Sequence, residues 1–258
     1  MNRIKNAFNK HPALMPYLTL GYPDPETSLD CVVASVEAGA DIIELGVPFS
    51  DPLADGPAIQ RSTQIALENG MTVKKCIEMT AELRRRGVAV PLLLMGYYNP
   101  IFAYGVAAYA RDAATAGADG FIVPDLPLDE ASELDSACNE NGLTLIPMLA
   151  PTSTAKRIAK ATSRKSGFIY LVSVAGVTGE RSGVATGLRE FVGRVKESAS
   201  IPVAVGFGIS TPAQAAEVGK IADGVIIGSA VIKAASGENP VEGVRSFIKS
   251  VKGALVVT

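Results

Sequence analysis

Three acidic side chains in one short stretch are of the types that carry out acid–base chemistry. The stretch ADIIELGVPFSDPLADGP (40–57) places Glu44 inside an apolar run and Asp51 and Asp55 in the proline-rich loop that follows. A buried carboxylate is costly unless it is paired or hydrogen-bonded, and burial tends to raise its pKa. Carboxyl groups held in different environments can supply an acid and a base at neutral pH. We therefore predict that Glu44 and at least one loop acid form an acid–base site.

Each acid also has a structural interpretation. The alternative for Glu44 is an ion pair with an arginine or lysine elsewhere in the chain. The alternative for Asp51 and Asp55 is helix capping or solvation, as is common for a single loop aspartate. Two acids that follow a strand with a buried glutamate favour a site that includes at least one of them.

Glycine-rich turns form the second candidate site. They occur in AGVTGERSGVATG (175–187), GFGIS (206–210) and GSA (228–230). Glycines let backbone N–H groups approach an anion, and helix N-termini carry positive partial charge. We predict a phosphate site here, with the first stretch long and polar enough to act as a lid. The alternative is that Gly206 and Gly208 only permit tight turns.

Other residue types restrict the chemistry. The single histidine, His11, lies outside any expected strand end, which argues against a histidine triad or histidine metal site. No lysine lies in or directly after an expected strand, which argues against a Schiff-base aldolase. Asp51 and Asp55 have no further acidic cluster beside them, so we expect no metal. What remains is acid–base chemistry by carboxyl groups on a small phosphorylated substrate.

The elements that must position these residues alternate between short apolar runs and polar helical stretches. Near-continuous apolar runs are typical of parallel strands covered on both sides. The runs are 14–21, 41–49, 91–97, 120–125, 144–149, 168–173, 202–208 and 224–229.

Helix signals separate the runs. Asp24-Pro25 and Thr211-Pro212 each place a capping side chain before a proline suited to the first helical position. The stretch 57–86 is long enough for more than one helix. A similar short sequence recurs at residues 38–46, 116–125 and 221–229 (AGADIIELG, AGADGFIVPD and IADGVIIGS). We predict that each copy ends a helix and then makes a tight turn into the next strand.

Eight strand–helix units in this length predict an α/β fold of the (β/α)8 TIM-barrel type, with residues 1–258 as a single domain with extra helices. The alternative is a doubly wound sheet. That fold usually places its glycine fingerprint after the first strand, whereas here the glycine turns come late.

Composition excludes several classes. The chain has 258 residues, 48% of them hydrophobic, and a net charge of -2, with no basic stripe for nucleic acid. No apolar run approaches the roughly 20 residues of a membrane span. Three scattered cysteines without CxxC spacing indicate reduced thiols, and we expect a cytoplasmic protein. The run Arg84-Arg85-Arg86 before Gly87 is typical of a helix C-terminus.

Five motifs resemble one known family. They are ELGVPFSDPLADGP (44–57), VPDLP (123–127), AGVTG (175–179), GFGIS (206–210) and GSA (228–230). In the same order, and over nearly the whole chain, they resemble the tryptophan synthase α chain. The resemblance implies a lyase of amino-acid biosynthesis that cleaves indole-3-glycerol phosphate to indole and glyceraldehyde 3-phosphate.

The same resemblance implies roles for individual residues. Glu44 matches a catalytic glutamate that shuttles protons, and Asp55 matches a catalytic aspartate that stabilises positive charge at the indole N–H. Asp51 stays a turn or capping residue. The implied phosphate contacts are Gly179, Gly208, Gly228 and Ser229. The implied indole pocket and lid are Tyr17, Ile122, Tyr170, Thr178 and Phe207.

The family works as an αββα complex, in which indole passes through a tunnel to a β chain that holds pyridoxal phosphate. The resemblance therefore implies a β-chain partner and no cofactor in this chain. The implied β-facing residues are Pro52, Leu53, Ala54, Asn99 and Pro127. Two stretches depart from the family pattern: MGYYNP (95–100) leaves open whether Tyr97 or Tyr98 meets the ligand, and Val174 replaces an arginine found in some members.

Three alternatives to this function stay open. One is another phosphate-binding barrel, such as indole-3-glycerol phosphate synthase or phosphoribosylanthranilate isomerase, although the synthase needs a strand-end lysine. The second is a non-catalytic α-like subunit that only activates a β chain, which the presence of both Glu44 and Asp55 argues against. The third is a stand-alone lyase that releases indole.

Overall fold

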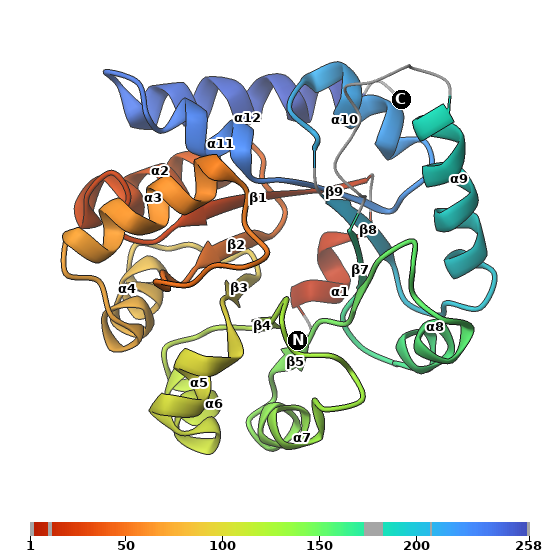
Figure 1. Ribbon diagram of the computed structural model, residues 1–258. Coiled ribbons are helices and arrows are strands. Elements are labelled where there is room, and N and C mark those ends of the chain that lie inside the picture. Colours follow the sequence, from red (N-terminus) through yellow and green to blue (C-terminus); the bar gives the residue numbers. More distant parts are fainter. Residues whose placement is uncertain (1–2, 10–11, 173–182, 207, 257–258) are drawn as a thin grey trace.

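Among the residues that the structure describes, nine short parallel strands form one sheet. The computed structural model describes residues 3–9, 12–172, 183–206 and 208–256, and Figure 1 shows the strands encircled by helices. The strand order is β5-β4-β3-β2-β1-β9-β8-β7-β6. The strands are β1 (Ala13–Thr19), β2 (Ile43–Gly46), β3 (Leu92–Met95), β4 (Gly120–Ile122), β5 (Thr144–Leu145), β6 (Met148–Leu149), β7 (Ile169–Val172), β8 (Val203–Gly206) and β9 (Gly224–Ile227).

The sheet closes on itself at Ile146 and Pro147. The Ile146 N–H donates to the Phe121 carbonyl of β4 at 2.9 Å, and the Pro147 carbonyl accepts from the Tyr170 N–H of β7 at 2.9 Å. One stretch of chain therefore pairs with both neighbours, so the sheet is a barrel. Because proline has no N–H, the ladder is interrupted here and one barrel position forms two short strands. All eight predicted strand positions, and the (β/α)8 barrel, are confirmed.

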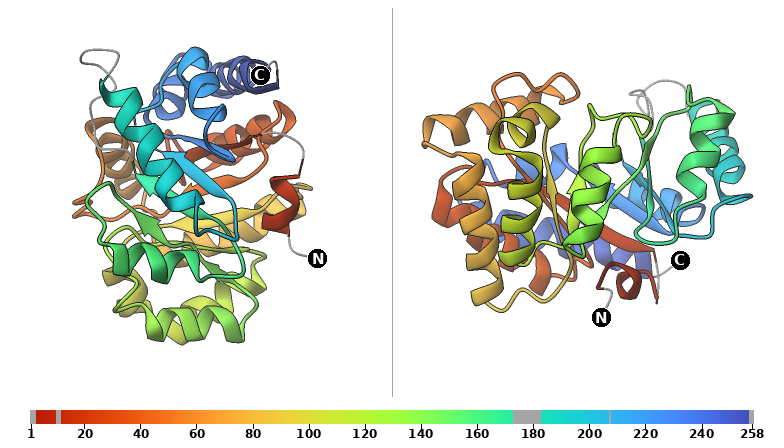
Figure 2. Two further views of the ribbon diagram at one scale, coloured as in Figure 1. Left: turned by 90° about the vertical axis from the view of Figure 1, so that its right-hand side faces the viewer. Right: turned by 90° about the horizontal axis from the view of Figure 1, so that it is seen from below.

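Helices cover the outside of the barrel, and two further views show this from the side and from below (Figure 2). The stretch 57–86 contains two helices, as predicted. None of the helices in the described ranges is both long and apolar enough to cross a membrane. The helices are α1 (Arg3–Ala7), α2 (Pro25–Glu37), α3 (Pro57–Glu68), α4 (Val73–Arg85), α5 (Tyr98–Tyr104), α6 (Val106–Thr115), α7 (Ser132–Glu140), α8 (Ala155–Thr162), α9 (Gly183–Lys196), α10 (Pro212–Gly219), α11 (Ser229–Ala234) and α12 (Pro240–Val256).

The two predicted capping residues begin α2 and α10. Asp24 accepts a hydrogen bond from the Thr27 N–H at 2.9 Å, and Thr211 accepts one from the Gln214 N–H at 3.2 Å. A proline occupies the start of each helix, where its missing N–H costs nothing. Both helix starts are thus confirmed.

Three aspartates join neighbouring strands at the N-terminal end of the barrel. They are the aspartates of the short sequence that recurs at 38–46, 116–125 and 221–229. In the first two copies the preceding glycines, Gly39 and Gly117, have positive φ, as a tight turn out of a helix requires. The carboxylates of Asp41, Asp119 and Asp223 accept hydrogen bonds of 2.8, 2.9 and 2.8 Å from backbone N–H groups at the start of β1, β3 and β8. Each aspartate therefore ties its own strand to the one next to it.

The same three carboxylates also bind the outer helices. Their cationic partners are Lys252 on α12, Arg84 on α4 and Lys196 on α9, at 2.7, 2.6 and 2.7 Å. Arg84 comes from the arginine run predicted to end a helix, and it does lie in the last turn of α4. Its guanidinium also donates to three backbone carbonyls, those of Gly117, Val88 and Val90.

Helix α1 lies against this end of the barrel as well. Arg3 makes a second ion pair with Asp119 at 3.0 Å, and the Phe8 ring packs 5.6 Å from the ring of Phe168, directly before β7. The N-terminal end is therefore held by packing and ion pairs. In a (β/α)8 barrel this leaves the opposite end, where the strands finish, for binding and chemistry.

Replacing Asp119 by alanine tests the strand-joining role. The change removes the acceptor of the Leu92 N–H and leaves the half-buried Arg84 without its carboxylate. We expect the free energy of unfolding to fall by about 3 kcal/mol, because an uncompensated buried charge is strongly destabilising. Urea titration followed by circular dichroism measures this loss.

The matched control is Asp129→Ala. Asp129 pairs with Lys160 at 3.1 Å, but both side chains are 46% exposed. Such a surface pair contributes under about 1 kcal/mol. Equal losses in the two variants would contradict a special role for Asp119.

Candidate functional site

Glu44 is wholly buried inside the barrel. Its Cα pairs with that of Tyr17 on β1 and that of Leu93 on β3. The residue has 0% exposure, and neither carboxylate oxygen has a hydrogen-bond partner among the described residues. The ion-pair alternative for Glu44 is therefore not met in the described part of the chain. Burial raises the pKa of Glu44 to about 8, so the carboxyl is mostly protonated at neutral pH.

Asp55 reaches the same place from the loop after β2. Partial burial raises the pKa of Asp55 to about 6, against the opposing effect of a hydrogen bond from the Tyr97 hydroxyl. The Tyr97 hydroxyl also accepts from the Ala54 N–H at 2.9 Å and so holds the loop beside the carboxyl. Tyr98 faces away, with its hydroxyl 3.4 Å from the Glu133 carboxylate. Of the two tyrosines that the sequence left open, Tyr97 is the one that contacts Asp55, although it does not line the cavity.

Asp51 lies outside the site. Its carboxylate is exposed and accepts a 2.6 Å hydrogen bond from the Ser50 hydroxyl, and its carbonyl accepts from the Leu53 N–H at 3.0 Å. Helix α3 begins without a side-chain cap. The turn interpretation of Asp51 is confirmed, and the capping interpretation is wrong because the helix starts six residues further on at Pro57.

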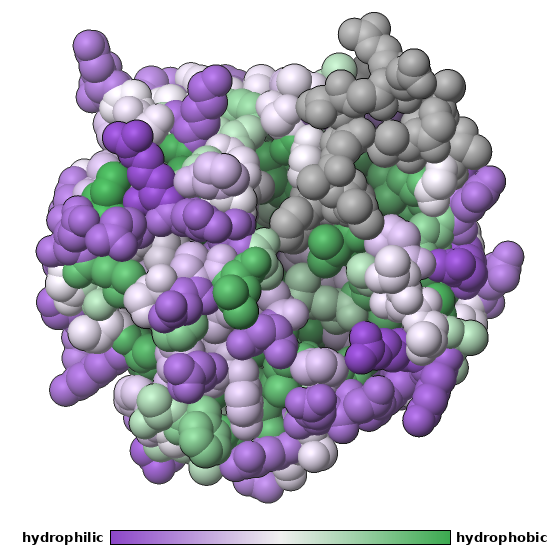
Figure 3. Space-filling view, viewed as in Figure 1, coloured by the Kyte–Doolittle hydropathy of each residue, from purple (hydrophilic) through white to green (hydrophobic). Residues whose placement is uncertain are grey.

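The two carboxyl groups face one cavity of about 140 Å³ at the C-terminal ends of the strands. Figure 3 shows apolar surface gathered near the middle of one face of the molecule, within a hydrophilic rim. The predicted site residues that line the cavity are Tyr17, Glu44, Asp55, Tyr170, Gly208, Gly228 and Ser229. Acid groups, aromatic walls and glycine turns are thus brought together from β1, β2, β7 and the loops after β2, β8 and β9.

Six lining residues were not assigned to the site from the sequence. They are Gly56, Ile59, Met95, Ile209, Ser210 and Ile226. Ile209 and Ser210 belong to the GFGIS motif, so the motif itself was a usable signal for them. The apolar residues on strands and helices carry no such signal, because a pocket wall and a core contact select the same side chains.

Two glycines make room for two tyrosine hydroxyls. A Cβ on Gly46 would overlap the Tyr17 hydroxyl, and a Cβ on Gly206 would overlap the Tyr170 hydroxyl. Gly206 therefore permits a close approach rather than a tight turn. Gly208, with φ of +79°, is the one that makes the turn.

The remaining predicted residues lie elsewhere or outside the described chain. Ile122 is fully buried on β4, beside Met95, and does not line the cavity. Thr178, Gly179 and Phe207 lie outside the described residues, as does Val174. The residues expected to face a partner lie after three neighbouring strands: Pro52, Leu53 and Ala54 after β2, Asn99 on α5 after β3, and Pro127 after β4.

Large exposed apolar side chains occur on the same rim. Leu53 is 91% exposed, and Phe102 on α5 is 62% exposed. Nothing in the sequence singles out Phe102, since an aromatic residue in a helix usually belongs to the core. Among the described residues the other large exposed apolar side chain is Val256, at the end of α12.

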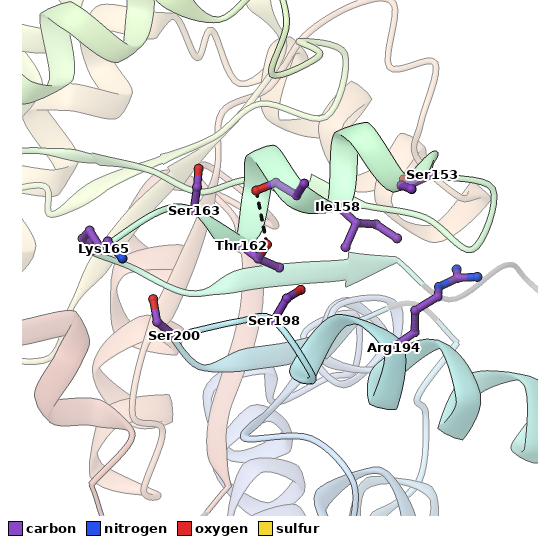
Figure 4. A pocket seen from close by; sticks show the side chains of 10 residues that line it. Ser153, Ile158, Thr162, Ser163, Lys165, Arg194, Ser198 and Ser200 are labelled. Carbon is purple, nitrogen blue, oxygen red and sulfur yellow. Dashed lines mark hydrogen bonds between the residues drawn. The ribbon is translucent and has the colours of Figure 1, made fainter.

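A larger hollow of about 500 Å³ lies between α8 and α9 (Figure 4). Its lining has two cations, Lys165 and Arg194, but no carboxyl group. The Arg194 guanidinium donates to the Pro151 carbonyl at 3.2 Å, and the Thr162 hydroxyl donates to a carbonyl of its own helix. The described residues also contain no group of three or more His, Cys, Asp or Glu that could hold a metal. Of these two hollows, the barrel cavity is the one whose lining contains carboxyl groups.

The fold and the cavity define a (β/α)8-barrel protein with a carboxyl pair of unlike pKa at the C-terminal ends of its strands. Residues 4–253 match the family model described as tryptophan synthase alpha chain. The chain belongs to this family. Its members are the lyase subunit of the tryptophan synthase complex.

Individual relatives agree with the family model. The chain is 48% identical to the tryptophan synthase alpha chain of Dehalococcoides mccartyi, over 99% of this chain and 100% of the relative. It superposes on the tryptophan synthase subunit alpha of Legionella pneumophila with a TM-score of 0.93 at 35% identity, and both chains are covered completely. A chain of Mycobacterium tuberculosis tryptophan synthase in its aminoacrylate-bound form gives a TM-score of 0.88 at 38% identity, with 99% of this chain and 100% of that chain covered.

Burial of Glu44 makes stability depend on pH. Its pKa of about 8 in the folded state lies above its ordinary value of 4.5. Between these values the folded state binds more protons than the unfolded state, so stability falls as the pH rises. The contribution of Glu44 is most favourable below about pH 4.5 and is fully lost above about pH 8.

Glu44→Gln should remove this dependence, because glutamine stays neutral. We expect the variant to gain about 3–4 kcal/mol relative to the parent chain between pH 5 and pH 8, measured by urea titration at each pH. The control Glu68→Gln changes an exposed carboxyl on α3 and should keep the parent's dependence. An unchanged pH dependence in Glu44→Gln would show that Glu44 is not buried as described.

Proposed function

We propose that this chain cleaves indole-3-glycerol phosphate to indole and glyceraldehyde 3-phosphate in the barrel cavity. The observation that carries the proposal is a wholly buried carboxyl group whose pKa is raised to about 8, facing the same cavity as a second carboxyl group whose pKa is raised to about 6. At neutral pH the first is mostly the acid and the second mostly the anion. One site therefore offers both a proton and a negative charge.

The bond changes of a retro-aldol cleavage suit this pair. The Glu44 carboxyl gives its proton to C3 of the indole ring, and Asp55 stabilises the positive charge that develops at the ring N–H. The carboxylate left on Glu44 then accepts the proton of the adjacent side-chain hydroxyl. The bond between the ring and the side chain breaks, the hydroxyl carbon becomes the aldehyde, and the ring recovers its aromaticity as indole. Glu44 ends protonated, as it began.

The substrate would lie across the cavity. We assign the phosphate to the glycine turns with Gly179, Gly208, Gly228 and Ser229. We assign the indole ring to the wall with Tyr17, Tyr170 and Phe207, with Thr178 in the lid. Ile122 lies beside Met95 and does not line the cavity, so no contact with the ring is assigned to it. Gly208, Gly228 and Ser229 support this orientation because they line the cavity that the carboxyl groups also face.

We further propose an αββα complex with a β chain, which receives the indole through a tunnel and carries the pyridoxal phosphate. No cofactor is assigned to this chain. The proposed contact surface is formed by Pro52, Leu53, Ala54, Asn99 and Pro127. Exposure of Leu53 and of Phe102, which follow the neighbouring strands β2 and β3, supports it, since exposed apolar side chains within a hydrophilic surface are typical of an interface.

Residues 1–258 are proposed to act as one domain in the cytoplasm. The adjacency of β1 and β9 supports a single unit, because the first and last strands complete one ring. The three cysteines, Cys31, Cys76 and Cys138, are buried and form no disulfide, in keeping with a reducing compartment.

Activity of carboxyl variants tests the cleavage. Purified chain is incubated with indole-3-glycerol phosphate, with and without a β chain, and indole release is measured. We expect Glu44→Gln to lower kcat by about 10²- to 10⁴-fold and Asp55→Asn to lower it strongly as well, since each removes an ionisable group from the proposed chemistry. The matched control Asp51→Asn changes the exposed acid of the same loop and should keep kcat within about 3-fold without partner.

Each outcome separates one alternative. No indole in either condition would contradict the lyase and favour an α-like subunit that only activates its partner. Substantial release without a β chain would favour a stand-alone lyase. Parent-like turnover in Glu44→Gln would remove Glu44 from the mechanism.

Replacing Leu53 by serine tests the partner surface. The side chain is 91% exposed, and its burial against a β chain would contribute about 1–2 kcal/mol. We expect the dissociation constant for the β chain, measured by titration calorimetry, to rise about 10-fold. The control Val256→Ser changes another exposed apolar side chain, 61% exposed on α12. Equal weakening by both variants would contradict a contact at Leu53.

A further inference from the structure

The barrel cavity places negative charge beside the glycine turns without a cation. In the part of the chain that the structure describes, its lining contains the carboxyl groups of Glu44 and Asp55 and no lysine or arginine. Asp55 is mostly ionised at neutral pH, because its pKa is about 6. A phosphate monoester carries close to two negative charges at this pH. Repulsion from Asp55 therefore opposes entry of a phosphorylated ligand unless positive charge lies nearby.

A hollow of about 1060 Å³ borders the end of the cavity that the glycine turns form. Ser210 and Ser229 line both spaces, so the hollow and the cavity meet at these turns. The described lining of the hollow contains two cations, Arg61 on α3 and Lys233 on α11, and no acid. We call this space the cationic hollow.

Two helices that pack together bring the cations close to the glycine turns. Lys233 follows Ser229 by four residues on α11, so the two side chains lie on one face of this helix, with Cβ atoms about 5–6 Å apart. Helix α3 contacts α11, and the Ile59 side chain of α3 lies 3.4 Å from where a Cβ of Gly228 would be. Arg61 comes two residues later on α3 and lines the cationic hollow.

Both cations are available to a ligand. The side chains of Arg61 and Lys233 are exposed, and neither forms an ion pair within the described ranges. Arg61 also lines a second hollow together with Asp51, but the two groups do not form an ion pair. Charges of one sign in a cleft raise the local concentration of ligands of the opposite sign. The cationic hollow therefore attracts anions to the mouth of the cavity.

We propose that Arg61 and Lys233 guide the phosphate group of the substrate to the glycine turns by long-range attraction. The inference rests on the proposed function, which assigns the phosphate to Gly208, Gly228 and Ser229. The two cations offset the repulsion from Asp55 while the ligand enters, and backbone N–H groups then hold the phosphate. Neither cation contacts the reacting atoms, so both act on capture of the substrate and leave the cleavage step unchanged.

The double variant Arg61→Gln/Lys233→Gln tests this guidance in the chain without a partner. The probe is indole-3-propanol phosphate, which cannot be cleaved, and titration calorimetry measures its dissociation constant at two salt concentrations. We expect the constant to rise about 3- to 10-fold at about 20 mM salt and less than about 2-fold at about 500 mM, where salt screens the attraction. For indole-3-glycerol phosphate, KM should rise at low salt and kcat should stay within about 2-fold.

The matched control is Lys74→Gln/Lys249→Gln. It makes the same change in net charge with exposed lysines of α4 and α12 that line neither the cavity nor the cationic hollow. This variant should keep the parent's dissociation constant at both salt concentrations. Uncharged indole serves as a second control, and its inhibition constant should be the same in the parent chain and in Arg61→Gln/Lys233→Gln.

Three results would overturn the inference while the proposed function stands. They are a parent-like dissociation constant of Arg61→Gln/Lys233→Gln at low salt, an equal loss in the control variant, and a loss that persists at about 500 mM salt, which would indicate direct contact. A parent chain that releases no indole would instead refute the proposed cleavage. Binding of the analogue does not require cleavage, so the two failures are distinguishable. Thermal unfolding of each variant verifies that the chain is folded.

Discussion

Burial of the Glu44 carboxyl without a hydrogen-bond partner is the interaction on which the rest of the site depends. Removal from water raises the pKa of this group to about 8 and so keeps a proton available at neutral pH. The same burial opposes ionisation of Glu44 in the folded chain, so the folded state loses stability as the pH rises toward the raised pKa. The strands β1 and β3 flank Glu44 on both sides, and its side chain is wholly buried.

The free-energy cost of burying Glu44 is compatible with a stable chain because hydrogen bonds and ion pairs hold the barrel together at the N-terminal ends of its strands. The carboxylates of Asp41, Asp119 and Asp223 each join two strands and a helix where the strands begin. These groups are paired and hydrogen-bonded, whereas Glu44 is neither. The two ends of the barrel thus place carboxyl groups in opposite surroundings, paired where the strands begin and unpaired at Glu44.

Unlike environments also distinguish the two acids of the cavity. Asp55 lies on a loop, is less buried than Glu44 and receives a hydrogen bond from Tyr97, so its pKa rises only to about 6. Close packing of tyrosine against glycine shapes the space between them. Gly46 and Gly206 allow the hydroxyls of Tyr17 and Tyr170 to enter the barrel where any larger residue would exclude them. The geometry of the cavity is therefore as much a property of its glycines as of its acids.

The sequence by itself determined the order of strands and helices, because hydrophobic runs, caps and glycine turns are local signals. It also indicated Glu44, since a carboxylate in an apolar strand is unusual wherever the strand lies. Motifs, not periodicity, separated Asp55 from Asp51 and named a substrate.

Tertiary structure alone decided which side chains meet. It brought Tyr97 rather than Tyr98 to Asp55 and left Ile122 out of the cavity. It also exposed Phe102, and it assembled the hydroxyls of Tyr17, Thr19 and Ser62 from a strand and a distant helix. Tyr97 and Tyr98 carry the same side chain and have nearly the same sequence context. Only the closure of the barrel, which sets the direction of each side chain at the strand ends, gives them different surroundings.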